Sequence, residues 1–209
     1  MRCLLIDTCT SNLVVSIIND NTIEYLFNSK VDSELSSMFI PIINGAFKKC
    51  SIRPNDIDKV FVSNGPGSFT GIRIGLAFAK TFCWALNKDL IFFTSLELIA
   101  TSSNNNCLSL IDARRGYVYR GFYDSNLNKL SNEKYISIAE VVNEIETYNN
   151  LDYYSYDSFE NFNVKSVKID ILKLINKHIN DKPVNPHELK PSYLKNTEAE
   201  EKLNSDKRD

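Results

Sequence analysis

Residues 60–80 read VFVSNGPGSFTGIRIGLAFAK and predict a strand, a tight loop and a helix, the unit around which the rest of the chain is organised. The β-branched and aromatic residues 60–62 favour a buried strand. Three glycines and a proline between residues 65 and 71 favour a tight loop, because glycine adopts backbone angles that other residues resist. Thr70 is the N-cap that we predict for the helix.

The predicted helix has more apolar surface than one sheet can cover. At about 100° per residue, one stripe consists of Ile72, Leu76, Ala79, Cys83 and Leu86. A second stripe beside it consists of Ile74, Phe78, Phe82 and Ala85. Together they span roughly 200°, about twice what a helix on a single sheet requires. The second stripe therefore needs another helix, from this chain or from a partner, and Gly71 and Gly75 would let such a neighbour come close.

Composition restricts the class of protein. The chain has 209 residues, 43% hydrophobic and 24% charged, as is typical of a soluble globular protein with one large or two small domains. A net charge of -2 argues against a large nucleic-acid-binding face. The apolar runs are too short to cross a membrane and the N-terminus lacks signal-peptide features, so we expect a cytoplasmic protein. The five cysteines are widely spaced, which predicts reduced core thiols.

The first half predicts the element order β-β-β-α-β-α-β-α. Its three opening strands are hairpin-linked and cover residues 2–6, 13–18 and 22–27. A helix over 33–50 follows, with Asp32 or Ser33 as its cap and Pro41 as a kink or a late start. After the unit at 60–86 come a strand at 91–93 and a helix at 96–100 capped by Ser95. We assign residues 1–101 to a first domain.

The second half predicts a shortened variation on the first, and we assign residues 102–209 to a second domain. Beyond a polar break at 102–106, the expected elements are strands at 107–111 and 117–123, a helix from the Ser137 cap to about 148, a strand at 153–156 and a helix at 169–179. The charged end, 198–209, is expected to fray.

The sequence offers little for catalysis. Its two histidines, His178 and His187, are late, and neither belongs to a metal-binding spacing, so we expect no metal site and no catalytic residue. His187 is predicted to lie in an exposed loop. Ser68 lies in the glycine-rich loop, but a nucleophilic serine needs an oriented base and none is evident. The loop could hold a phosphate on backbone N–H groups, although it matches neither common phosphate-binding motif.

Two aspartates follow predicted strands in equivalent places. Asp7 and Asp112 could face a cleft between related domains and organise a metal–nucleotide complex, a vestigial nucleotide site. No glycine comes directly after either acid, so side chains would obstruct a phosphate. Alternatively, both carboxylates cap turns through Asx-type hydrogen bonds, and the sequence leaves both interpretations open.

A resemblance to a known family joins these features. The signature at Gly65, Pro66, Gly67, Ser68, Phe69, Thr70, Gly71, Arg73 and Gly75 resembles that of the bacterial TsaB (YeaZ) family, the dimerisation subunit of the complex that makes threonylcarbamoyladenosine in tRNA. Residues 4–10, 112–119 and 191–195 resemble other segments of that family. The chain departs from the family at Leu35, near which a histidine is common, and in its short second half.

The resemblance implies an α/β, actin-like ATPase fold (ASKHA, ribonuclease H-like) of two related β-β-β-α-β-α domains, the second reduced. It also implies a non-catalytic scaffold that pairs helix to helix with the catalytic subunit TsaD and recruits the ATPase TsaE. The modified tRNA adenosine lies next to the anticodon, and tRNA would be reached indirectly through the complex. No cofactor of its own is implied, although a nucleotide can bind at the interface of the complex.

This scaffold is the leading hypothesis, and a small-molecule kinase or phosphatase of the same fold is the alternative. A metal-dependent peptidase, also suggested by the superfamily, lacks ligands. For the scaffold we predict an exposed partner surface that also promotes homodimers of the free chain: Ile40, Phe47, Ile74, Phe78, Phe82 and Ala85. We further expect Asp or Arg at Phe78 to lower partner affinity by orders of magnitude while leaving the monomer folded, because the first stripe is untouched.

Overall fold

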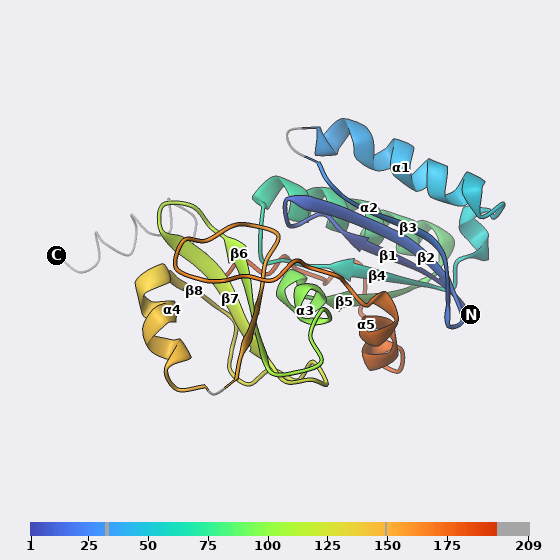
Figure 1. Cartoon of the computed structure of the whole chain (residues 1–209). Helices are drawn as coiled ribbons and strands as arrows, with labels where there is room; N and C mark the ends of the chain where they lie inside the picture. The colour runs from blue at the N-terminus through green and yellow to red at the C-terminus, as the bar shows by residue number, and fades with distance from the viewer. Residues whose placement is uncertain (32–33, 149, 196–209) are drawn as a thin grey trace.

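Two mixed β-sheets form the body of the protein (Figure 1). The computed structural model describes residues 1–31, 34–148 and 150–195. The first sheet has the order β3-β2-β1-β4-β5, with β1 (Arg2–Asp7), β2 (Asn12–Asn19), β3 (Thr22–Lys30), β4 (Lys59–Ser63) and β5 (Asp89–Phe93). The second has the order β8-β7-β6-β9, with β6 (Cys107–Asp112), β7 (Tyr117–Tyr123), β8 (Lys134–Ser137) and β9 (Asp152–Tyr154).

The two sheets share one topology. In each, the first strand pairs antiparallel with the second, the second with the third, and a later strand joins the first in parallel. This repeat confirms the predicted actin-like fold of two related β-β-β-α-β-α units. Strand β8, which completes the second set of three, was missing from the prediction, because its four residues are half-buried or exposed and carry no clear alternation.

The helices lie in three layers around the sheets (Figure 1). Helices α1 (Leu35–Lys49) and α2 (Phe69–Leu86) cover one face of the first sheet, and α3 (Ser95–Ala100) and α5 (Ile171–His178) pack between the two sheets. Helix α4 (Ile138–Ile145) covers the outer face of the second sheet, and a 3₁₀ turn, η1 (Pro54–Asp56), precedes β4. Strand β1 is buried from Cys3 onward, because helices cover both faces of its sheet.

Three details of the helix ends differ from the prediction. Ser68 rather than Thr70 caps α2, since its Oγ accepts from the Gly71 N–H at 3.2 Å, and Thr94 rather than Ser95 caps α3. Pro41 lies inside α1 and does not delay its start. Ser137 caps α4 as predicted, while the predicted caps Asp32 and Ser33, like the charged end 198–209, lie outside the described residues.

The segment after α5 returns to the first sheet. The Val184 N–H donates to the Leu90 carbonyl at 2.9 Å, and the Ser192 N–H donates to the Asn64 carbonyl at 2.7 Å. Leu189 is buried in the core between the first sheet and its outer helices. Residues 184–192 therefore complete the first unit, whereas the domain division at 101/102 stays a prediction.

Candidate partner-binding site

The glycine-rich motif seats α2 against the turn between β1 and β2. The Ser68 N–H donates to the Cys9 carbonyl at 2.7 Å. A Cβ on Gly71 would lie 1.9 Å from the Thr8 carbonyl oxygen, and one on Gly67, whose φ is +150°, would lie 2.0 Å from that of Cys9. The glycines thus admit the backbone of a turn. Our expectation that Gly71 and Gly75 admit a neighbouring helix was wrong, since Gly75 also faces Thr8.

Three backbone donors at the start of α2 are already bonded within the chain. The N–H groups of Ser68, Gly71 and Ile72 donate to the Cys9 carbonyl, the Ser68 hydroxyl and the Ser68 carbonyl. They therefore do not form the phosphate cradle that the sequence left open. Ser68 Oγ is occupied as the helix cap, and no side-chain base hydrogen-bonds to it within the described ranges.

Both strand-end aspartates form Asx turns. Asp7 Oδ1 accepts from the Cys9 N–H at 2.9 Å, and Asp112 Oδ1 accepts from the Arg114 N–H at 2.8 Å. Asp7 is fully buried, and no donor in the described part of the chain reaches its Oδ2. Burial raises the pKa of Asp7, and the Cys9 N–H, with smaller contributions from the side chains of Cys9, Ser63 and Ser95, offsets this rise only in part. Asp112 is exposed, and the structure records no contact between the two acids among its described residues. A vestigial nucleotide site stays a prediction.

An apolar groove separates α1 from α2. It measures about 570 Å³, and it is lined chiefly by Phe39, Ile40, Ile43, Phe47, Ile74, Phe78, Phe82 and Ala85. Four aromatic rings join the helices at its floor: Phe78 meets Phe39 edge-on at 5.3 Å and lies 5.5 Å from Phe82, which stacks on Phe47 at 6.2 Å. The structure thus gathers all six predicted interface residues around one hollow, which we call the α1–α2 groove.

Exposure differs among those six residues. Ile40 is 47% exposed and Ala85 is exposed, whereas Ile74, Phe78 and Phe82 are half-buried. Phe47 is only 7% exposed, so the prediction that it is an exposed strip residue was wrong, because Phe82 stacks on its ring. The residues of the first stripe are buried against the sheet, except for half-buried Leu86, which lines the groove.

Helix α1 therefore covers part of the second stripe, the apolar surface that we assigned to a partner. Because Phe78 touches Phe39 and Phe82, a charge there would enter the contact between α1 and α2. The expectation that such a variant stays folded does not follow from this packing. Ile40 and Ala85 are the positions where a charge would face solvent in the free chain.

The carboxyl-terminal motif joins the glycine-rich motif at the start of α2. The Tyr193 ring stacks on Phe69 with 4.7 Å between ring centroids, and the Tyr193 hydroxyl accepts from Arg73 Nε at 3.2 Å. Two segments about 120 residues apart in sequence thus form one surface.

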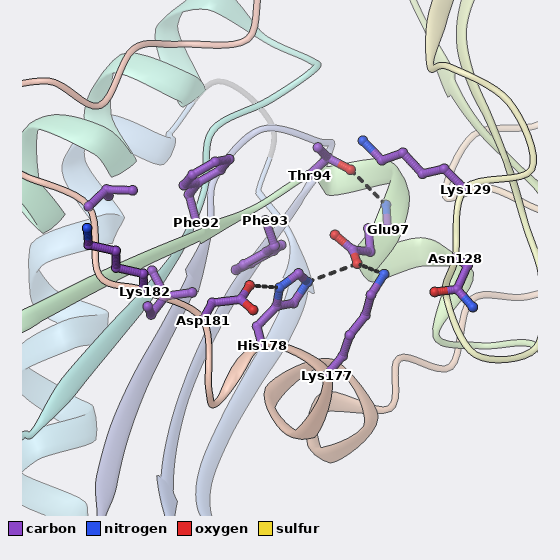
Figure 2. Close-up of a pocket in the computed structure, with 12 residues that line it drawn as sticks. Phe92, Phe93, Thr94, Glu97, Asn128, Lys129, Lys177, His178, Asp181 and Lys182 are labelled. Carbon is purple, nitrogen blue, oxygen red and sulfur yellow. Dashed lines mark hydrogen bonds and ion pairs between the residues drawn. The ribbon is translucent and has the colours of Figure 1, made fainter.

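A cluster of ionised side chains fixes the end of α5 to α3 (Figure 2). Glu97 Oε1 lies 2.6 Å from Lys177 Nζ and 2.9 Å from His178 Nε2, and His178 Nδ1 lies 2.6 Å from Asp181 Oδ2. Burial alone would lower the pKa of His178, but the two carboxylates outweigh it and raise the pKa above its ordinary value. With a carboxylate at each ring nitrogen, the geometry fits an imidazolium.

This cluster lines a hollow of about 350 Å³ between β5, α3 and α5 (Figure 2). On its far side, Thr94 Oγ1 donates to Glu133 Oε1 at 2.5 Å, and Lys129 Nζ lies 3.2 Å from the same oxygen. The carboxylates thus pair with cations or hydroxyls of the same chain. Sequence reasoning missed the cluster, because its members come from distant elements. The segment that follows the cluster returns to the first sheet.

Metal and membrane features are limited to two findings. Within residues 1–31, 34–148 and 150–195, no group of three or more His, Cys, Asp or Glu side chains could hold a metal ion. None of the helices described there combines the length and apolar character needed to cross a membrane. His187 is exposed in a loop, as predicted.

The comparisons with known proteins agree with this arrangement. A family model described as TsaD, tRNA N6-adenosine threonylcarbamoyltransferase, matches residues 29–202. The tRNA threonylcarbamoyladenosine biosynthesis protein TsaB of Bacillus subtilis is 35% identical over 128 residues, covering 59% of this chain and 55% of that protein. The chain belongs to this family, within its TsaB (YeaZ) group.

Further TsaB relatives support the assignment. TsaB of Escherichia coli is 30% identical over 133 residues, covering 61% of this chain and 57% of that protein, so the chain spans little more than half the length of these two relatives. The solved structure of YeaZ from Pseudomonas aeruginosa superposes with a TM-score of 0.72 at 16% identity, covering 92% of this chain and 99% of the other. At that identity, the superposition establishes a shared fold.

Proposed function

We propose that this TsaB-family chain is a non-catalytic subunit in the synthesis of threonylcarbamoyladenosine in tRNA, and that it binds a TsaD-type catalytic subunit through the α1–α2 groove. One observation carries the proposal: the groove keeps Ile40 and Ala85 exposed beside half-buried Phe78 and Phe82. Fully burying a side chain such as Phe or Ile contributes about 1.5–3 kcal/mol of favourable free energy. Binding of a partner on the groove would bury the apolar surface that the free chain leaves in water.

The family model supports the kind of partner. The model named for TsaD matches residues 29–202, a range that contains both α1 and α2. A TsaD-type subunit should therefore have an equivalent pair of helices. Two related chains can join such faces around an approximate two-fold axis, as two copies of one chain would. The same reasoning predicts weak homodimers of the free chain.

The packing of the glycine-rich loop supports a non-catalytic role. A kinase or phosphatase needs donors for phosphate and carboxylates for its metal ion. Here the Ser68, Gly71 and Ile72 N–H groups bond within the chain, and Asp7 is fully buried. We propose further that the complex recruits a TsaE-type ATPase, reaches the tRNA adenosine next to the anticodon through the catalytic subunit, and works in the cytoplasm.

Reconstitution tests this function. The purified chain is combined with TsaD-type and TsaE-type proteins of the same organism, the activated threonylcarbamoyl donor and unmodified tRNA, and product nucleosides are measured by mass spectrometry. We expect product only when the chain joins the catalytic subunit, and we expect Asp7→Asn to support the reaction as well as wild type. Product or rapid ATP hydrolysis by the chain alone, lost in Asp7→Asn, would instead establish the alternative enzyme.

A further inference from the structure

A third face of α2 forms a groove that the proposed function has not used. Residues 73, 77, 80 and 84 follow one another at helical spacing on a face that points neither to the sheet nor to α1. The returning segment 186–191 runs beside this face and leaves a hollow of about 440 Å³. We call it the Trp84 groove. Its lining includes Arg73, Ala77, Lys80, Trp84, Pro186 and Leu189.

Trp84 is the feature that marks this groove as unfilled. Its side chain is 66% exposed, the highest value for a large hydrophobic residue in the described part of the chain. One flank of the indole meets the His187 ring edge-on, with 6.1 Å between centroids. Tryptophan is enriched among the residues that contribute most of the binding energy at protein interfaces.

The charges of the groove have one sign. Arg73 Nε donates to the Tyr193 hydroxyl at 3.2 Å, and Lys80 Nζ donates to the Leu189 carbonyl at 3.1 Å, so the returning segment holds both cations in place. Neither cation faces a carboxylate, because no Asp or Glu is among the described residues that line the groove. This contrasts with the overall charge of -2. An occupant with carboxylates would give each of the two cations a partner of opposite charge.

The Trp84 groove continues the surface that we assign to the partner. Thr81 lines both grooves, and Ala85 of the α1–α2 groove is adjacent to Trp84 in sequence. A polypeptide seated on the α1–α2 groove can therefore pass over α2 without leaving the surface. Successive bases need a row of aromatic rings to stack on, whereas Trp84 and His187 are the only such rings among the described residues of this lining and the rest of its apolar part is aliphatic, which suits side chains of a polypeptide.

We infer that the Trp84 groove binds an acidic segment of the catalytic subunit, with an apolar side chain against Trp84 and separate carboxylates at Arg73 and Lys80. The inference rests on the proposed function and extends it, since the partner would then contact two faces of α2. Sequence reasoning missed this site, although a tryptophan on the cationic face of α2 was the available signal.

Trp84 is the only tryptophan of the chain, so it reports on its own groove. Emission spectra and acrylamide quenching are recorded for the free chain and for its complex with a tryptophan-free variant of the TsaD-type subunit. Calorimetry measures association independently. We expect the complex to shift Trp84 emission to shorter wavelength and to protect it from quenching.

Charge variants test the chemistry of the occupant. Lys80→Glu should weaken association by about tenfold or more, because like charges would then face each other. Ala77→Glu, at an exposed groove position, should do the same even if the Lys80 variant proves unstable. Lys88→Glu is the matched control: its Nζ bonds to the Asn55 carbonyl at 2.8 Å outside the groove, so affinity should stay within about twofold.

The outcomes separate the two proposals. Absence of any complex by calorimetry would count against the proposed function itself. A complex that forms with unchanged Trp84 emission, or that tolerates Lys80→Glu and Ala77→Glu as well as Lys88→Glu, would overturn the Trp84 inference alone. Protection of Trp84 by tRNA, without the protein partner, would also overturn it and assign the groove to nucleic acid.

Discussion

Thr8 and Gly71 hold each other across the start of α2. Thr8 Oγ1 donates to the Gly71 carbonyl at 2.7 Å, and a Cβ on Gly71 would lie only 1.9 Å from the Thr8 carbonyl oxygen. The glycine-rich motif therefore serves to fix α2 on the sheet, and α2 in turn forms one wall of both grooves.

Gly71→Ala should destabilise the protein by about 3 kcal/mol, since a backbone oxygen cannot give way as a flexible side chain would. Gly45→Ala is the matched control: it lies on the exposed side of α1, where an added methyl group would meet open space, so it should add about 0.5–1 kcal/mol. Urea unfolding followed by circular dichroism measures both. Equal effects of the two substitutions would contradict this role of Gly71.

Asp7→Asn should stabilise the protein at neutral pH by on the order of 1–3 kcal/mol, because it removes a buried carboxylate whose Oδ2 lacks a donor among the described residues. Since folding raises the pKa of Asp7 above 3.8, wild-type stability falls as pH rises from that value to the folded pKa. The advantage of the variant should therefore grow with pH from about 4 and then level off. Melting temperatures across pH measure it, and an advantage greatest in acid would refute this explanation.

Much of the fold was predictable because local signals agreed with it. Periodicity placed α2 and the division of its stripes, and residues such as Ile72 and Leu76 are buried as expected. Thr70 was predicted as the cap because its hydroxyl could accept an unpaired N–H at the helix start, but Ser68 fills that role, since the helix begins two residues earlier.

The remainder depended on distant contacts. Phe47 has the spacing of an exposed strip, but it packs in the core between the first sheet and its outer helices, where the ring of Phe82 from another helix stacks on it. Glu97 and His178 are 81 residues apart, so no local pattern indicates their pair. The return of residues 184–192 to the first sheet likewise follows from pairing with Leu90 and Asn64 and not from periodicity.

His178→Gln should remove a pH-dependent part of the stability. Because folding raises the pKa of His178, its contribution is fully present below the ordinary value of 6.5 and is lost as pH rises through the folded pKa. We expect the variant to be about 1.5 kcal/mol less stable at pH 6, with the difference shrinking in alkaline solution. Thermal melts from pH 6 to 9 would show this, with exposed His187→Gln as the control. A gap between His178→Gln and wild type that widens with pH would disprove the account.

The cysteines should differ in reactivity. Burial raises the pKa of Cys3 to about 11 and those of Cys83 and Cys107 to about 12, and these thiols are shielded from solvent. Only half-buried Cys50 should react promptly with an alkylating reagent in the native protein, and Cys50→Ser should leave partner binding intact. Mass spectrometry identifies the modified residue. Prompt labelling of Cys107 would show that the interior opens more readily than its packing indicates.

The most direct test of the account is calorimetric titration of the TsaD-type subunit with Ala85→Glu and Ile40→Glu variants, beside wild type and Gly45→Ala. Both charged positions face solvent in the free chain, so circular dichroism should show native folding. If the α1–α2 groove is the interface, each charge is buried without a partner and affinity falls by about a hundredfold or more, while Gly45→Ala binds normally. Wild-type affinity in both folded, charged variants would contradict the central claim and place the partner elsewhere.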